Sequence, residues 1–109
     1  MDRRIELVIA QLEANTSRAW DARTLGDLVH LSESRFRHLF KQETGTTPAQ
    51  YLRDLRFQRA EVMLRTTFLS VKEIAEKVGT TSINHFMKDF KRRYGMTPGE
   101  YRTAAKRKH

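Results

Sequence analysis

Apolar positions recur at helical spacing along this chain of 109 residues. The first group is four aliphatic residues at i, i+3, i+4 and i+7, which places them on one face of a helix: Ile5, Val8, Ile9 and Leu12. No segment shows the alternation of apolar and polar residues that is typical of a half-buried strand. The pattern predicts an all-α protein of about seven helices.

Local signals predict where the later helices begin and end. A short helix is predicted over 21–29, and Ser32 is a suitable N-cap for the next one, because its hydroxyl can accept from the free N–H groups of the first turn. Two glycines can end helices in the left-handed conformation, and each precedes a Thr-Pro pair that suits a helix start: Gly45 with Thr47-Pro48, and Gly95 with Thr97-Pro98. Further helices are predicted over 48–66, 71–78 and 83–94.

The chain contains an internal repeat. Seven residues recur with an offset of fifty positions: Phe36, Phe40, Lys41, Gly45, Thr47, Pro48 and Tyr51 match Phe86, Phe90, Lys91, Gly95, Thr97, Pro98 and Tyr101. Upstream the offset is 49, since Leu25 matches Ile74 and Val29 matches Val78, so the second copy holds one inserted residue in its turn. Each copy is a helix, a short turn and a second helix, the arrangement that places its second helix in a DNA major groove.

The repeat predicts three parts of the chain. They are a first helix–turn–helix subdomain over 1–47, a linker helix over 48–66 and a second helix–turn–helix subdomain over 67–109. A linker of this size is roughly 28 Å long, and two recognition helices on one face of a duplex need centres about 34 Å apart. The linker length is therefore compatible with reading two adjacent major-groove segments.

The outward positions of the two predicted recognition helices are the candidate DNA contacts. With the phenylalanines turned inward, the outward side chains are polar or cationic: Ser34, Arg35, Arg37, His38 and Lys41 in the first copy, and Asn84, His85, Lys88, Lys91 and Arg92 in the second, with Met87 at the margin. Arginine can bond guanine O6 and N7 as a fork, and asparagine can pair with adenine N6 and N7. Lys41 and Lys91, farther along their helices, are predicted to contact phosphates, which positions the protein without specifying sequence.

Net charge supports a polyanionic partner. The chain has 21 Lys and Arg against 13 Asp and Glu, a formal charge of +8. Residues 1–68 hold eleven basic and nine acidic side chains, whereas residues 69–109 hold ten and four, so most of the net positive charge lies in the second copy and the tail that follows it. The absence of cysteine excludes disulfides and thiol chemistry. No transmembrane stretch or signal peptide is evident, and a cytoplasmic, nucleoid-associated protein is predicted.

These motifs resemble the DNA-binding domain of the AraC/XylS family of bacterial transcription regulators. The resemblance covers nearly the whole chain, and its most specific part runs from Ile74-Ala75-Glu76-Lys77-Val78-Gly79 through Phe86 and Phe90-Lys91 to Tyr94-Gly95-Met96-Thr97-Pro98. It implies two helix–turn–helix units bridged by a long helix, which bind adjacent major-groove segments as a monomeric module. The chain departs from the family at Gly26, where alanine is usual, at Thr80, where an aromatic is usual, and at Asp89, where an apolar residue is common. We expect the first two changes to loosen helix packing, and Asp89 to leave less apolar area on the second recognition helix.

The predicted function is sequence-specific DNA binding at an asymmetric site, with double-stranded DNA as the partner and RNA polymerase as a second candidate partner. Two alternatives stay open: a basic all-α protein-interaction module, and a non-specific architectural DNA binder. No catalytic or phosphate-loop motif is present and the histidines lack metal-ligand spacing, so we predict no enzyme, no metal and no cofactor. The chain begins close to its first helix, which favours an excised C-terminal domain whose sensing or dimerisation domain is missing over a complete small regulator.

Overall fold

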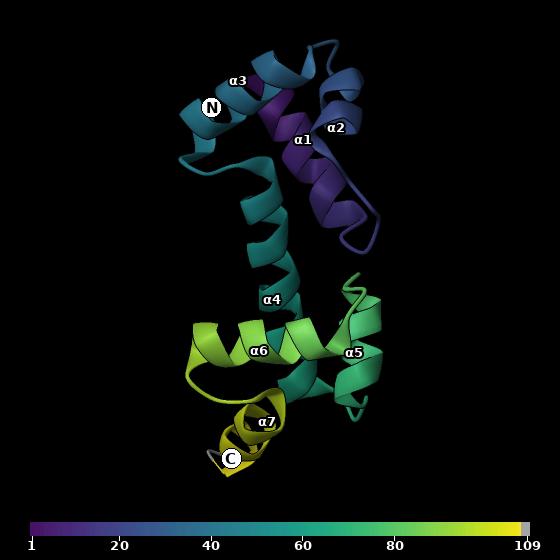
Figure 1. Cartoon of the computed structure of the whole chain (residues 1–109), viewed down its shortest axis with the longest axis vertical. Helices are drawn as coiled ribbons and strands as arrows, with labels where there is room; N and C mark the ends of the chain where they lie inside the picture. Colours follow the sequence, from purple (N-terminus) through teal and green to yellow (C-terminus); the bar gives the residue numbers. More distant parts are fainter. Residues whose placement is uncertain (108–109) are drawn as a thin grey trace. The chain divides into compact units, whose positions relative to one another are not determined.

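The computed structural model describes residues 1–107, which form seven α-helices and no strand (Figure 1). The helices are α1 (Arg3–Ala14), α2 (Ala22–Leu28), α3 (Glu33–Thr44), α4 (Pro48–Thr66), α5 (Val71–Lys77), α6 (Ile83–Tyr94) and α7 (Pro98–Arg107). The predicted all-α class is confirmed, and the expected helix over 48–66 is one uninterrupted helix.

Two compact units make up the chain, Met1–Leu55 and Arg56–His109. The boundary between them falls inside α4, because the first part of this helix packs in the first unit and the later part in the second. The three-part division at 47 and 66 stays a prediction, although α4 has the bounds expected for the linker helix. In terms of packing, α4 supplies core residues to both units.

The first unit buries one face each of α1, α2 and α3, together with the start of α4. Its core consists of apolar side chains that are less than a tenth exposed: Ile5, Val8, Leu12, Ala22, Leu25, Phe36, Phe40 and Leu52. Trp20 packs against this core from the loop between α1 and α2, and its Nε1–H donates to the carbonyl of Asn15 at 2.8 Å. The ring therefore covers the core where the chain turns, with its polar edge satisfied.

The second unit repeats the arrangement around a more aromatic core: Phe57, Ala60, Leu64, Ile74, Ala75, Val78, Phe86 and Phe90. Tyr94 and Tyr101 pack against it, and the Tyr101 hydroxyl donates to Glu61 Oε1 at 2.5 Å. Arg102 Nε–H donates to the carbonyl of Leu64 at 3.1 Å, which satisfies a carbonyl near the C-terminal end of α4.

The turn between α2 and α3 packs closely against Gly26, the first position at which the chain departs from the family pattern. Gly26 is buried, and a Cβ added to it would lie 2.8 Å from the carbonyl oxygen of Leu31 and 3.3 Å from Phe36 Cβ. The expectation of loosened packing at Gly26 is therefore wrong, because the missing methyl group allows close approach of the turn to α2. At the second departure the Thr80 hydroxyl donates to the carbonyl of Ala75 at 2.8 Å and so ties the second turn to α5, while the expected looser packing there stays a prediction.

Candidate nucleic-acid interface

The second helix of the first predicted helix–turn–helix, α3, is held at both ends by the residues predicted from the sequence. Ser32 Oγ accepts from the Arg35 N–H at 3.2 Å, and Gly45 ends the helix with a φ of 79°. Phe36 and Phe40 are completely buried in the core of the first unit. Because these rings fix the rotation of the helix, its opposite face is turned to solvent.

All five residues predicted on this outer face are exposed: Ser34, Arg35, Arg37, His38 and Lys41. In the free protein Arg37 is paired with Glu33, one turn earlier, with an N–O distance of 2.8 Å. Both side chains are about half exposed, at 60% and 48%, and such a pair contributes only about 0.3–0.5 kcal/mol. An incoming anion or hydrogen-bond acceptor can therefore compete with Glu33 for the Arg37 guanidinium at a small cost in free energy.

The corresponding helix of the second copy, α6, has the same arrangement. Ser82 Oγ accepts from the His85 N–H at 3.3 Å, Gly95 ends the helix with a φ of 76°, and Phe86 and Phe90 are buried. The five predicted outward residues are again all exposed: Asn84, His85, Lys88, Lys91 and Arg92. Each unit therefore gathers its five candidates on one exposed helix.

The two outer faces differ in chemistry. Besides its five candidates, α3 carries Glu33 in its first turn, whereas the last turn of α6 is basic, with Lys91, Arg92 and Arg93. Met87 is 39% exposed and adds apolar surface to α6, at the margin where the sequence predicted it. Asp89 is half-buried beside this face and lies 3.8 Å from Arg92. An asparagine amide and a methionine on α6 thus contrast with arginines and a serine on α3.

One cationic side chain beside the first face was missed by the sequence analysis. Arg4, on α1, lines an open hollow of about 520 Å³ together with residues of α3 and of the preceding turn: Leu31, Ser34, Arg35, His38 and Leu39. Helical periodicity alone only placed Arg4 outside the apolar stripe of its helix. Thirty positions separate it from Ser34, so only the packing of α1 against α3 brings the two together.

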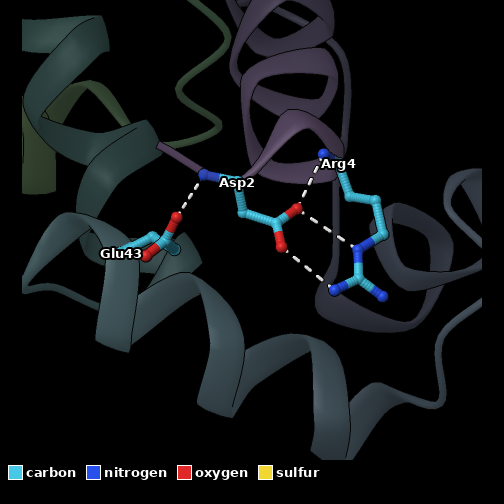
Figure 2. A network of polar contacts seen from close by, with 3 residues as sticks. All are labelled: Asp2, Arg4 and Glu43. Atoms are coloured by element: carbon cyan, nitrogen blue, oxygen red, sulfur yellow. Dashed lines mark hydrogen bonds and ion pairs between the residues drawn. The ribbon is translucent and has the colours of Figure 1, made fainter.

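Figure 2 shows how Arg4 is held in the free protein. Its guanidinium donates to both carboxylate oxygens of Asp2, at 3.2 Å from Nε and 3.0 Å from Nη2, and Asp2 also caps α1 by accepting from the Arg4 N–H at 2.8 Å. These hydrogen bonds from Arg4 lower the pKa of the Asp2 carboxyl. The backbone N–H of Asp2 donates in turn to Glu43 near the end of α3, which ties the start of α1 to that helix (Figure 2).

The described part of the chain has neither a metal-ion site nor a membrane-spanning helix. Residues 1–107 hold no group of three or more histidine or carboxylate side chains placed to bind a metal ion. None of the helices described is both long enough and apolar enough to cross a lipid bilayer.

Comparison with known proteins agrees with this geometry. A family model described as a helix-turn-helix domain matches residues 25–104. The activator RclR of Escherichia coli (strain K12), named as an RCS-specific HTH-type transcriptional activator, is 41% identical over 99 residues, which are 91% of this chain and 35% of RclR. An AraC-type regulator structure from Chromobacterium violaceum superposes with a TM-score of 0.85 at 28% identity, covering 94% of this chain and 91% of that one.

The chain belongs to the AraC/XylS family. As an AraC-type domain it is the DNA-binding helix–turn–helix part of a transcription regulator, and domains of this class are not enzymes. The DNA-binding domain of AdpA, a global transcriptional factor solved in complex with a target DNA, superposes on the AraC-type domain with a TM-score of 0.93 at 28% identity, covering 99% of this chain and 97% of that one. The chain spans about a third of the length of the curated relatives that it matches.

Proposed function

We propose that this AraC-type domain reads a specific, asymmetric DNA site by inserting α3 and α6 into adjacent major-groove segments. One observation supports this most directly. Each unit buries two phenylalanines of one helix, α3 in the first unit and α6 in the second. The same helix leaves five hydrogen-bonding or cationic side chains exposed. A major groove about 12 Å wide admits one such helix.

Base recognition would come from side chains near the start of each helix, as in other helix–turn–helix proteins. On α3 these are Ser34, Arg37 and His38, and on α6 they are Asn84, His85 and Lys88. Arg37 has the fork of donors that suits guanine, whereas the Asn84 amide suits adenine. Since the two sets differ, the preferred site has two unlike halves.

Affinity would come mainly from lysine and arginine side chains that neutralise phosphates. Lys41, Lys91 and Arg92 lie toward the ends of their helices and carry no sequence information in this role. Each phosphate contact releases counterions, so binding should weaken steeply as salt is raised.

A single chain carries both reading helices, so the domain itself would bind as a monomer. Binding near a promoter would bring it within reach of RNA polymerase, the second partner in this proposal. Operator binding would also place the protein in the cytoplasm at the nucleoid.

The test is selection of bound duplexes from a random library at near-physiological salt, followed by competition of the selected site against a scrambled duplex. We expect two different sequence blocks with centres about 10 base pairs apart, and a preference of at least about a thousandfold over scrambled DNA. A palindromic motif would contradict reading by two unlike helices in one chain. Salt-sensitive binding without any motif would favour an architectural binder, and no binding to DNA would favour a protein-interaction module.

A further inference from the structure

We propose that the hollow between α1 and α3 is a seat for a DNA backbone phosphate, and that Arg4 is the side chain that closes on it. The inference rests on the proposed function for the orientation of the duplex. It adds a DNA contact from the first helix, outside the two helix–turn–helix copies.

The hollow lies beside the proposed reading face of α3. Three of the residues that line it, Ser34, Arg35 and His38, are also on the proposed reading face of α3. An α-helix with its side chains is about 10–12 Å across and the major groove is about 12 Å wide. The sugar-phosphate strands that border the groove must therefore lie against whatever flanks the inserted helix, and along this edge of α3 the flanking element is the first turn of α1.

The lining of the hollow is rich in hydrogen-bond donors and positive charge. The polar lining of the hollow is Arg4 from α1 together with Ser34, Arg35 and His38 from α3. These are hydrogen-bond donors, and two of them carry a full positive charge. The guanidinium groups of Arg4 and Arg35 suit the tetrahedral oxygens of a phosphate diester, while Leu31 and Leu39 form an apolar part of the wall.

Arg4 is exposed and paired only with a residue of its own helix terminus. Its side chain is 49% exposed, and its bound partner, the Asp2 carboxylate, is 25% exposed. The side-chain pair is local, between residues two apart, so it does not hold α1 to α3; the shared apolar core and the hydrogen bond from the Asp2 N–H to Glu43 do so (Figure 2). The Arg4 guanidinium can therefore turn from Asp2 to an arriving phosphate without unpacking the two helices.

The experiment compares Arg4→Ala with Arg3→Ala, a matched control that removes the same charge one position earlier on α1 from a residue that does not line the hollow. Binding to the selected and the scrambled duplex is measured over a series of salt concentrations. For Arg4→Ala we expect affinity to fall roughly tenfold on both duplexes, and the slope of log K against log salt to flatten by about one. Arg3→Ala should leave that slope nearly unchanged.

Two further variants separate the phosphate contact from an effect on folding. Arg4→Lys keeps the charge and should restore the salt slope. Asp2→Asn keeps an N-cap oxygen but removes the carboxylate that competes for Arg4, so binding should become severalfold tighter on both duplexes. Circular dichroism melting of each variant identifies any that is unfolded at the assay temperature.

The outcomes distinguish this inference from the proposed function. If the wild-type domain selects a motif but Arg4→Ala and Arg3→Ala have equal effects on affinity and slope, the phosphate seat is wrong and the reading function stands. If wild-type binding shows no motif but Arg4→Ala alone flattens the salt slope, the seat stands and sequence-specific reading is wrong.

Discussion

Replacement of Gly26 by alanine should destabilise the first unit, although alanine is the better helix former. Gly26 lies within α2, where the exchange by itself would gain about 1 kcal/mol of helix propensity. The added Cβ, however, would lie 2.8 Å from the Leu31 carbonyl oxygen. That oxygen is backbone, and the Leu31 N–H donates to the Gly26 carbonyl at 2.9 Å, so the turn cannot move away without losing this hydrogen bond.

The size of the effect follows from these opposing terms. Forcing an extra carbon into a packed site typically costs about 1–3 kcal/mol, which leaves a net loss of about 1 kcal/mol after the propensity gain. A loss of this size lowers the melting temperature of a small domain by roughly 4–8 °C. Because the same turn orients α3, we also expect weaker DNA binding at temperatures where the variant is folded.

The repeat supplies an internal control for Gly26. Ala75 is its counterpart at the offset of 49 and is 2% exposed, so the second unit already accommodates the methyl group. Ala75→Gly should lower stability by at least about 1 kcal/mol, through lost helix propensity and lost packing. The two substitutions are chemical inverses, yet both should lower the midpoint in urea and thermal denaturation followed by circular dichroism. A Gly26→Ala midpoint at or above that of the wild type would refute the steric reasoning.

Three further predictions concern recognition, backbone strain and pH. Arg37→Ala should change the free energy of unfolding by no more than about 0.5 kcal/mol, because its ion pair is exposed. It should weaken binding to the selected site by about 1–3 kcal/mol and relax the base preference in one half-site. Equal losses on selected and scrambled duplexes would instead identify Arg37 as a phosphate contact. His30, in the turn between α2 and α3, has a φ of 60°, and its counterpart Gly79 in the second copy has a φ of 95°. His30→Gly should therefore raise the free energy of unfolding by about 0.5 kcal/mol. A lower denaturation midpoint would argue against backbone strain at His30. Burial, with a smaller contribution from the Glu61 carboxylate, raises the pKa of Tyr94 from 10.0 to about 12. Since the folded state favours the neutral phenol, the stabilisation is fully present below about pH 10 and is lost as pH rises toward 12. Over that interval Tyr94→Phe should lose less stability than the wild type in denaturation measured at stepped pH. Identical losses would contradict a raised pKa of Tyr94 as the cause.

Much of the fold could be predicted from local signals because those signals act within a few residues. Ser32 and Ser82 cap the helices that follow them, and Gly45 and Gly95 adopt the left-handed conformation that ends a helix. These interactions need no distant partner, so a sequence pattern is sufficient to predict them. The outward faces of α3 and α6 were predictable for the same reason, since two buried phenylalanines on each helix set which side faces solvent.

The departures from the family pattern show where such reasoning ends. Gly26 was expected to loosen the packing, but the space available to a Cβ there depends on Leu31 and Phe36, which reach it only after the turn has formed. At Thr80 the pattern noted only the absence of the usual aromatic, and it did not predict that the hydroxyl donates to the Ala75 carbonyl. In both cases the neighbours of the side chain decide its effect, and a one-residue pattern does not identify those neighbours.

Caps, helical period and buried aromatics are properties of short segments, and the repeat, the helix ends and the exposed residues of α3 and α6 can therefore be predicted from the amino-acid sequence. Which residues from different helices lie together is visible only in the fold. It divided α4 between two cores, and it placed Arg4 of α1 beside Ser34 and Arg35 of α3. Contacts between helices depend on crossing positions and turn geometry, which many residues set jointly, and a candidate phosphate seat built from two helices is therefore visible only in the folded chain.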